Sequence, residues 1–360
     1  MKIVIFAGGV GSRLWPLSRK NTPKQFENIV GDKSTLQLAI ERVLPISGWK
    51  DLYISTGKHY KDIIKEQLPE LPEENIILEP EMRDVGPAIG LVTAILEKID
   101  PDEPVALLWS DHLMKKEDVF RNALAVGAKL VKDAPEKLVF ICQKPRFAAQ
   151  NLGWAAFGDE KETIDGMTAY EFKGFKYKPA LETARNYFKD GHHAWNLGYF
   201  VTTPKTLWGL FQKYAPTLYQ DLKQIQDSYG TDKYDKVLAE VYPTIEKIHF
   251  DNAILENIGQ SDAYVLSVDL GWSDIGAWEQ LKEALTESDE ENATQGSTML
   301  KETRDSLVFN YTDQLVVGID LDGMIVINTG DVLLVCPKDS VPKIKKVVEA
   351  MKGTEYEKLT

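Results

Sequence analysis

The sequence of 360 residues has few cysteines and no long apolar run. Cys142 and Cys336 lie far apart within strand-like apolar runs, which indicates buried thiols in a reducing compartment and not a disulfide or a metal clip. No stretch is apolar enough to cross a bilayer, and the apolar residues 3–7 are too few for a signal peptide. We therefore expect a cytoplasmic protein without a membrane partner.

The sequence also has no excess of basic residues over acidic ones. The formal net charge of -13 at pH 7 argues against nucleic acid as a partner, because binding to a phosphate backbone requires a basic face. The amino-terminal segment is the exception, because it has no acidic residue before Glu27 but contains Lys2, Arg13, Arg19, Lys20 and Lys24. Such a local positive field suits a small polyanion.

Apolar runs typical of strands alternate with helical patterns along the first part of the chain. Strands are expected at residues 2–6, 52–55, 75–78, 105–110 and 138–143, and helices at 35–44, 60–68, 87–99 and 119–132. This alternation predicts an α/β fold with a mainly parallel, Rossmann-like sheet and helices on both faces. The pattern is mixed over 153–201, and helical patterns dominate 204–256.

Residues 286–298 are polar and contain almost no apolar side chain, so we predict a linker there. It separates a large domain over 1–285 from a small β-rich domain over 299–360. The small domain has short β-rich runs at 307–311, 315–319, 324–328 and 332–336 and a final helix over 340–351. It carries no obvious catalytic cluster, so we expect it to serve packing or homodimer formation.

The strongest motif is the run AGGVGSRLWP at residues 7–16, followed by PKQF at 23–26. Glycines after a buried strand let backbone N–H groups approach an anion, and Arg13 and Lys24 supply positive charge for phosphate oxygens. A dinucleotide fingerprint would need a third glycine at Leu14, and Pro16 would disrupt its helix, which argues against a nicotinamide-dependent oxidoreductase. A Walker loop is excluded because Gly-Lys-Ser/Thr is absent.

This run resembles the signature of the sugar nucleotidyltransferases, and its LWPLS and PKQF wording is most similar to the mannose-1-phosphate guanylyltransferases. The similarity continues in order along the chain, through the following residues and motifs: Glu79-Pro80, Arg83, Asp111-His112, Lys178-Pro179, WNLG at 195–198, Asp251 with Glu256, and WSDIGAW at 272–278. The resemblance implies a nucleotidyltransferase domain followed by a short domain similar to a left-handed β-helix. It also implies transfer of GMP from GTP to a sugar 1-phosphate, with mannose 1-phosphate as the expected acceptor.

Asp111 follows an apolar strand, so its carboxylate is expected at the carboxyl edge of the sheet, where open α/β folds bind ligands. An aspartate at such a position could instead cap the next segment, and the same holds for Asp274. The resemblance implies that Asp111 and Asp274 together hold Mg²⁺, which prefers carboxylate, water and phosphate oxygens. Arg13 and Lys24 complete the expected catalytic set, at the departing pyrophosphate and beside the phosphates respectively.

The resemblance also implies two groups of binding residues. The nucleotide is expected at Ala7, Gly8, Gly9, Gly11, Ser12, Arg13, Glu79, Arg83 and Pro87, and the sugar phosphate at Gly153, Lys178, Asn196 and Asp251. Without that context, a lysine is most often simply exposed, and an asparagine is most often a turn residue.

Several positions depart from the family pattern, notably Tyr177 in place of a sugar-binding glutamate, Leu197 in place of a serine, and Asn252 in place of a tyrosine. Ser110 and the loop at 83–87 also differ. Loss of a carboxylate acceptor and a bulkier Leu197 would alter the sugar pocket. Two alternatives therefore stay open: another pairing, such as thymidylyl transfer to glucose 1-phosphate, or a weakly catalytic paralogue that binds sugar nucleotides and regulates a partner.

Overall fold

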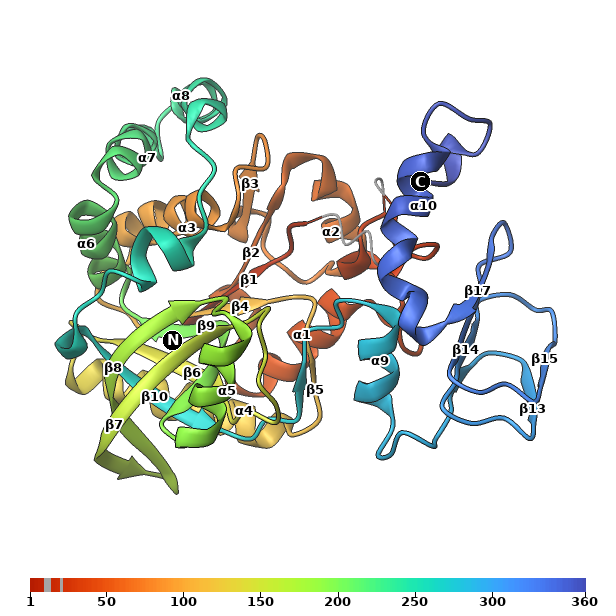
Figure 1. The fold of residues 1–360 in the computed structure, drawn as a ribbon. Coiled ribbons are helices and arrows are strands. Elements are labelled where there is room, and N and C mark those ends of the chain that lie inside the picture. The colour runs from red at the N-terminus through yellow and green to blue at the C-terminus, as the bar shows by residue number, and fades with distance from the viewer. Residues whose placement is uncertain (10–13, 20–21) are drawn as a thin grey trace. The chain divides into compact units, whose positions relative to one another are not determined.

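The computed structural model describes residues 1–9, 14–19 and 22–360. The chain folds into two compact units (Figure 1). The first comprises Met1–Gly8, Glu41–Trp109 and Lys115–Gly271, and the second comprises Gly9–Ile40, Ser110–Met114 and Trp272–Thr360. The units are not contiguous in sequence, unlike the predicted division at residue 285. Among the described residues, we find no helix with the length and apolarity that a membrane crossing requires.

The first unit is built on a nine-stranded sheet, in which β8 and β9 run opposite to the other strands. The mainly parallel sheet predicted from the sequence is thereby confirmed. Its order is β3 (Ile76–Glu79), β2 (Leu52–Gly57), β1 (Lys2–Phe6), β4 (Val105–Trp109), β9 (His193–Thr202), β6 (Leu138–Gln143), β10 (Ala263–Val268), β8 (Met167–Tyr177) and β7 (Gly153–Ile164).

Helices cover both faces of this sheet, as predicted (Figure 1). Alternate strand residues such as Val4, Leu107 and Phe140 are buried in one cluster with α3 (Val85–Ile99), α6 (Pro204–Tyr214) and α7 (Pro216–Ser228). The intervening residues face α4 (Glu117–Asp133) and α5 (Leu181–Asp190), as the contacts of Tyr199 with Phe120 and of Trp154 with Tyr187 show. Strands buried on both faces read as continuous apolar runs, which is why the sequence predicts them well. The remaining helices of this part of the chain are α1 (Thr35–Val43), α2 (Lys61–Gln67) and α8 (Tyr234–Val241).

The second unit contains short, mostly parallel strands stacked as in a β-helix. We call this part of the unit, residues 293–337, the coil. Strands β12 (Ala293–Gln295), β14 (Leu307–Asn310) and β16 (Met324–Asn328) pair in parallel, β13 (Thr298–Lys301) pairs in parallel with β15 (Val316–Ile319), and β17 (Leu333–Pro337) closes the sheet antiparallel to β16. Asn328 lies 18 positions after Asn310 and donates a hydrogen bond to its side chain, 3.1 Å away. This β-helix-like arrangement confirms the β-rich C-terminal prediction. The unit also includes β5 (Leu113–Met114), β11 (Trp272–Ser273), α9 (Trp278–Leu285) and α10 (Ile344–Met351).

The predicted linker at residues 286–298 differs from the structure, because it includes β12 and the first residue of β13. Its polar side chains form internal hydrogen bonds: the Asn292 side chain accepts from the Ser306 backbone N–H at 3.0 Å and donates to the Thr303 carbonyl at 2.6 Å. Ala293 is buried. A polar composition was therefore the wrong signal for a free linker here, because turns of a narrow coil also use polar side chains.

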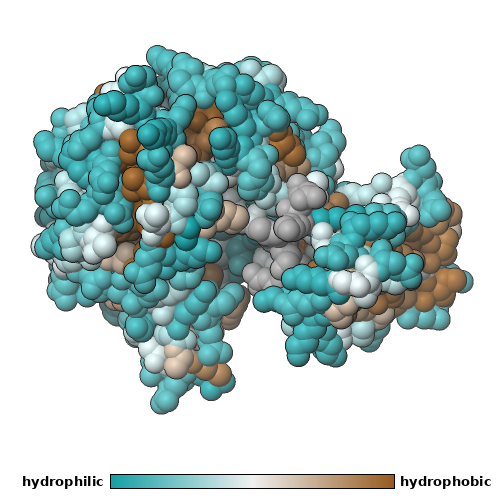
Figure 2. Space-filling view, turned by 90° about the horizontal axis from the view of Figure 1, so that it is seen from above, coloured by the Kyte–Doolittle hydropathy of each residue, from teal (hydrophilic) through white to brown (hydrophobic). Residues whose placement is uncertain are grey.

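Hydrophobic side chains are exposed on the strands of this coil (Figure 2). Met299 pairs with Val317 across β13 and β15, and Ile319 lies two residues further on β15, so that it points to the same side as Val317. These three side chains are 59%, 53% and 59% exposed. A contiguous apolar stripe of this kind on a sheet is typical of an interaction surface.

A buried ion pair holds α9 to the coil and gives a test of this architecture. Lys282 is 2% exposed, and its ammonium lies 2.6 Å from the Asp305 carboxylate and 2.8 Å from the Asp289 carbonyl. Lys282→Met leaves Asp305 with Lys338 as its remaining cation and should lower the free energy of unfolding by about 3 kcal/mol. Urea unfolding measures this. The control Lys345→Met removes an exposed pair with Glu349 and should stay within about 0.5 kcal/mol; equal effects would contradict the assignment.

Candidate functional site

Two distant aspartates are brought together by a short antiparallel pairing in the second unit. In β5 and β11, Leu113 pairs with Ser273 and Met114 with Trp272. Because the strands are antiparallel, the residues just before Leu113 face the residues just after Ser273. Asp111 and Asp274 occupy these two flanking segments, so the sequence-based prediction that both lie at one place agrees with the backbone arrangement.

The ammonium of Lys24 joins these two segments. Its Nζ lies 2.7 Å from the Asp111 carboxylate and donates to the backbone carbonyls of Asp274 at 3.5 Å and Ile275 at 3.3 Å. Ile275 has a φ of +37°, which is unusual for a β-branched residue and is found where surrounding contacts hold the backbone in place. Three of the four predicted catalytic residues, Lys24, Asp111 and Asp274, thus lie in one cluster.

The carboxyl of Asp111 is held in its ionised form. Burial alone would raise its pKa, but Lys24 at close range and the nearby His112 outweigh burial, so the pKa of Asp111 is lowered. His112 Nε2 lies 3.8 Å from Asp111, and its ring meets Trp272 edge-on with centroids 5.2 Å apart. An anionic oxygen is therefore ready to bind a cation without first losing a proton.

These residues fit a magnesium ion. Carboxylate and carbonyl oxygens are the hard donors that Mg²⁺ prefers, and it usually takes one or two carboxylates and fills its other positions with water and phosphate oxygens. In the described part of the chain, no group of three or more His, Cys, Asp or Glu residues could hold a metal. A magnesium ion held here would therefore take most of its ligands from water and a bound nucleotide.

The glycine-rich turn begins at the carboxyl end of β1. The Ala7 backbone N–H donates to the Ser55 carbonyl at 2.8 Å, and the Ala7 carbonyl accepts from the Thr56 hydroxyl at 2.7 Å, which fixes the start of the turn. Gly8 is exposed, and Gly9 has a φ of +103°, a conformation open to glycine. The predicted nucleotide-binding residues Gly11, Ser12 and Arg13 lie outside the described residues.

The predicted nucleotide-binding residues Glu79, Arg83 and Pro87 lie on the first unit, at the end of β3 and after it. Glu79 is 7% exposed, and its carboxylate accepts a 2.6 Å hydrogen bond from the Tyr242 hydroxyl. Arg83 donates to Glu81 at 2.8 Å, and Pro87 is buried in the first turn of α3. Glu79 therefore has an internal partner, which sequence reasoning missed because Tyr242 belongs to no recognised motif.

The four predicted sugar-phosphate residues lie close together on the first unit. Gly153 pairs with Asn196 across β7 and β9 and with Tyr177, the residue before Lys178, across β7 and β8. The Asn196 amide donates to the Asp251 carboxylate at 3.4 Å. Burial raises the pKa of Asp251, although His249, Lys178 and Asn196 each act in the opposite direction. Four residues spread over about a hundred positions thus form one polar cluster.

The backbone of this cluster has two unusual features. Lys178 has a φ of +44°, a left-handed conformation that long side chains rarely adopt. Asp251 begins a short π-helical turn, Asp251–Leu255, in which the Glu256 N–H donates to the Asp251 carbonyl at 2.9 Å. Strained backbone and single π-turns are often found at functional sites.

Comparison with known proteins agrees with this geometry. Residues 2–291 match the nucleotidyl transferase family, and residues 299–351 match the family described as "MannoseP isomerase/GMP-like beta-helix domain". The chain belongs to the nucleotidyl transferase family. The mannose-1-phosphate guanylyltransferase ManC of Salmonella typhimurium is 34% identical over 97% of this chain and 73% of its own length. The mannose-1-phosphate guanylyltransferase of Escherichia coli K12 is 32% identical over the same shares.

A solved structure also covers nearly the whole chain. The crystal structure of a Thermus thermophilus protein, named a mannose-1-phosphate geranyltransferase, superposes with a TM-score of 0.86 at 25% identity. It covers 98% of this chain, and 99% of that protein is matched. The fold of both parts of the chain is therefore that of a nucleotidyl transferase with its β-rich C-terminal domain.

Contacts around the polar cluster of Gly153, Lys178, Asn196 and Asp251 include residues to which the sequence analysis gave no role. The Glu256 carboxylate accepts from the Tyr177 backbone N–H at 3.2 Å and pairs with Lys176 at 3.0 Å. His249 lies 3.1 Å from the Asp84 carboxylate and 5.6 Å, between ring centroids, from Tyr177. His249 therefore connects the loop before α3 to the polar cluster around Lys178 and Asp251. The resemblance paired Glu256 with Asp251 but gave it no role, and no local signal marked His249.

The backbone beside Asn196 is held by a tryptophan. Gly198 has a φ of +75°, and a Cβ there would meet the Trp109 Nε1 at 2.2 Å. The Trp109 indole donates to the Gly198 carbonyl at 3.1 Å, and the Gly198 N–H donates to the Asn196 side chain at 3.1 Å. Glycine is therefore required at this position, and the Asn196 amide group is oriented by it toward Asp251.

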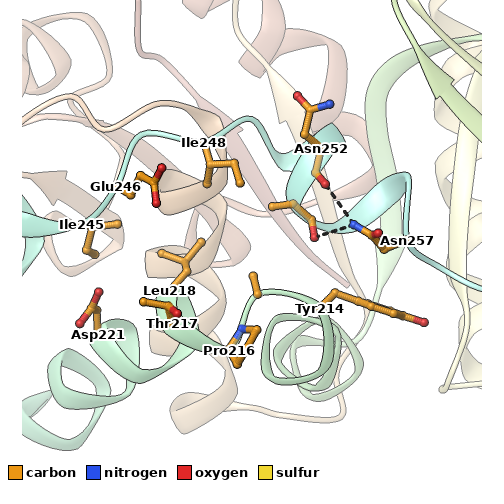
Figure 3. A pocket seen from close by; sticks show the side chains of 12 residues that line it. Tyr214, Pro216, Thr217, Leu218, Asp221, Ile245, Glu246, Ile248, Asn252 and Asn257 are labelled. Atoms are coloured by element: carbon orange, nitrogen blue, oxygen red, sulfur yellow. Dashed lines mark hydrogen bonds between the residues drawn. The ribbon is translucent and has the colours of Figure 1, made fainter.

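A pocket of about 310 Å³ lies beside the segment that carries Asp251 (Figure 3). It is formed by the α6–α7 corner and residues 245–257, and the Asn257 amide donates to the carbonyls of Asn252 at 3.1 Å and Ala253 at 3.2 Å. None of the predicted sugar-phosphate residues lines it. Asn252 lines this pocket, and its side chain also donates to Glu256 at 3.1 Å. Asn252, which departs from the family pattern, therefore contacts Glu256, and Glu256 in turn accepts from the backbone beside Lys178.

Glu79→Gln should change how stability depends on pH. Burial raises the pKa of Glu79 to about 7 from an ordinary 4.5, despite the hydrogen bond from Tyr242. As pH rises from 4.5 to 7, the unfolded chain releases this proton first, so the free energy of unfolding falls by about 3 kcal/mol in the wild type; below pH 4.5 the contribution is constant. The glutamine variant lacks this loss. Urea unfolding at pH 5 and pH 8 measures it, and identical pH dependence in both proteins would contradict the burial argument.

Proposed function

We propose that the protein transfers GMP from GTP to mannose 1-phosphate, producing GDP-mannose and pyrophosphate. The observation that carries the proposal is the cluster in which the Lys24 ammonium joins the anionic Asp111 to the backbone of Asp274. An ionised carboxylate can bind a metal ion, and a lysine and a glycine-rich turn can bind phosphate oxygens. Together these groups suit a nucleoside triphosphate with its metal ion. The names of the relatives from Salmonella typhimurium and Escherichia coli supply the nucleotide and the sugar.

The reaction forms one P–O bond and breaks another. An oxygen of the sugar phosphate attacks the α-phosphorus of GTP, and the bond from that phosphorus to the bridging oxygen breaks, with its electron pair leaving on pyrophosphate. The attacking phosphate is already ionised at neutral pH, so no general base is needed. Catalysis then depends on positioning and on neutralising phosphate charge, which is the task we assign to Lys24 and to Arg13.

Asp111 and Asp274 are proposed to hold Mg²⁺, which when bound supplies positive charge to the α-phosphate oxygens. Lys24 favours the ionised form of Asp111, and we propose that it also donates to phosphate oxygens of the bound nucleotide. On the first unit, Lys178 is proposed to bind the sugar phosphate, and Asn196 and Asp251 to bind sugar hydroxyls. The raised pKa of Asp251 fits a group that exchanges hydrogen bonds with neutral hydroxyls.

A panel of nucleoside triphosphates against a panel of sugar 1-phosphates, with Mg²⁺ and a pyrophosphate-release assay, tests the proposal. We expect release with GTP and mannose 1-phosphate. Release only with another pair, such as thymidine triphosphate and glucose 1-phosphate, would replace the substrates but keep the chemistry. Binding without release in every pair would favour the regulatory alternative and contradict catalysis.

Replacement of either proposed metal ligand should abolish most turnover. Asp111→Asn and Asp274→Asn keep the size of the side chain but remove its charge, so we expect kcat to fall by about 100-fold or more while the fold stays intact. The control Asp102→Asn changes an aspartate that is 74% exposed and should leave kcat unchanged. Steady-state kinetics and circular dichroism provide the measurements, and near-normal kcat in both site variants would remove the metal assignment.

We further propose that the protein is a homodimer in the cytoplasm, with the apolar stripe of Met299, Val317 and Ile319 covered by a second copy. Light scattering coupled to size-exclusion chromatography should then give twice the chain mass of 40.6 kDa. Val317→Lys places a charge in the middle of the stripe and should give the monomer mass. A wild-type monomer at micromolar concentration, or a Val317→Lys dimer, would contradict this interface.

A further inference from the structure

The segment between the glycine-rich turn and α1 is held by three C-terminal parts of the second unit, namely α9, the coil and residues 357–359. The Trp15 indole donates to the Leu359 carbonyl at 2.7 Å, and the Trp278 indole donates to the Trp15 carbonyl at 2.9 Å. Further along, the Tyr311 hydroxyl donates to the Ile29 carbonyl at 3.0 Å. Each of these bonds satisfies a polar group of a segment whose apolar side chains are themselves buried against the coil.

Apolar contacts also hold this segment against the coil. Leu14, Trp15 and Ile29 are 0%, 4% and 0% exposed and lie in one cluster with the strand residues Leu307 and Ile325 of the coil. Burial of three large side chains contributes several kcal/mol to keeping this segment on the coil. The predicted boundary at residue 285 hid this relationship, because the signature motif and the coil lie at opposite ends of the sequence.

An ion pair between Arg19 and Asp331 connects this segment to the loop between β16 and β17. The Arg19 guanidinium donates through both Nη atoms to the two Asp331 carboxylate oxygens, each at 2.7 Å, and through Nε to the Pro16 carbonyl at 3.0 Å. The Thr329 hydroxyl donates to the same carboxylate at 3.0 Å. A planar guanidinium with three directed hydrogen bonds fixes orientation as well as distance, which a lysine could not do.

We propose that Asp331 is a positioning residue that acts through Arg19 to hold the nucleotide-binding segment in place for the proposed transfer. The inference rests on the proposed function, because it assumes that this segment binds a triphosphate. Gly8 and Gly9 have no side chain that could anchor their own backbone, so their position depends on contacts made by the residues around them. On the C-terminal side, that fixing comes from the coil.

Two further contacts relate this segment to the phosphate-binding groups. Gln25, which is 1% exposed, donates from its amide to the Gly9 carbonyl at 3.2 Å. Its neighbour Lys24 forms the ion pair with Asp111. A shift of the segment would therefore move both a glycine of the turn and the lysine that is expected to meet phosphates. Both groups are proposed to bind the triphosphate, so such a shift should weaken nucleotide binding.

The pair contributes little to overall stability, which makes the inference testable. Asp331 has a side chain that is 47% exposed, and the pair lines an open pocket of about 390 Å³. Ion pairs reached by solvent contribute little to folding, and even a bidentate arginine pair such as this one is worth only about 1.5 kcal/mol, a small part of the free energy of unfolding of a domain. The hydrogen bond from Arg19 lowers the pKa of Asp331 to about 2, so the pair stays intact at neutral pH.

The experiment compares steady-state kinetics of Asp331→Asn, Asp331→Glu and Arg19→Gln with the wild type. We expect Asp331→Asn and Arg19→Gln each to raise KM for GTP about tenfold and to leave KM for mannose 1-phosphate unchanged. Asp331→Glu keeps the charge and should recover most of the affinity. The double variant should be no worse than either single one, because both remove the same interaction.

The matched control is Asp322→Asn. Asp322 also pairs with an arginine, Arg304, at 2.8 Å, but both members of this pair belong to the coil itself, where Arg304 also lies 3.6 Å from Glu290. We expect this variant to leave KM for GTP unchanged. A tenfold rise in the control as well, an unchanged KM in Asp331→Asn, or a loss of kcat and thermal stability with unchanged KM would each overturn the inference.

Hydrogen exchange of the nucleotide-free protein gives a second readout that does not need turnover. The backbone amides of Leu17, Ser18 and Arg19, which donate hydrogen bonds within this segment, should exchange about tenfold faster in Asp331→Asn than in the wild type and at the wild-type rate in Asp322→Asn. Faster exchange in Asp331→Asn would support the positioning role even if no substrate pair released pyrophosphate, which would defeat only the proposed function. Unchanged exchange in Asp331→Asn would defeat the positioning role itself.

Discussion

The ion pair between Lys24 and Asp111 is the interaction on which the candidate catalytic cluster depends. A carboxylate that is largely removed from water keeps its charge only if a cation lies beside it, and here one ammonium meets both the carboxylate and the backbone carbonyls of the opposing segment. The two segments are themselves brought face to face by the short pairing of β5 with β11. Charge and backbone geometry thus support each other.

Much of the fold can be predicted from the sequence because its strands are buried on both faces. Continuous apolar runs mark such strands directly, and the prediction for residues 138–143 has the same bounds as β6. The helices α1 to α4 were also recognised from their apolar periodicity, whereas α5 and α9 were not predicted as helices. The coil was predicted as β-rich from its short, evenly spaced apolar runs, and its parallel pairing came from the family resemblance.

The candidate site was predictable only where a motif exists. The convergence of Asp111 and Asp274, and that of Gly153, Asn196 and Asp251, followed from the resemblance and not from any local pattern. The bond between Tyr242 and Glu79, which are 163 positions apart, leaves no trace in composition or periodicity. The same holds for His249. The roles of all these site residues stay predictions, and Gly11, Ser12 and Arg13 lie outside the described residues.

The polar stretch at 286–298 was predicted to be a linker from its composition, but it includes β12 and so belongs in part to the coil. Composition reports how much apolar surface a segment can bury on its own, and a narrow coil buries its residues mainly through its neighbours. Local patterns therefore predict elements well and long-range partners poorly.

The bond between Trp15 and Leu359 spans 344 positions of the chain. During synthesis, residues 14–29 emerge early, but the surface that buries them is completed only when the last coil and the segment after it have been made. At usual rates of translation this interval is roughly tens of seconds. An apolar segment next to the glycine-rich turn therefore stays uncovered until the coil and the residues after it have been synthesised.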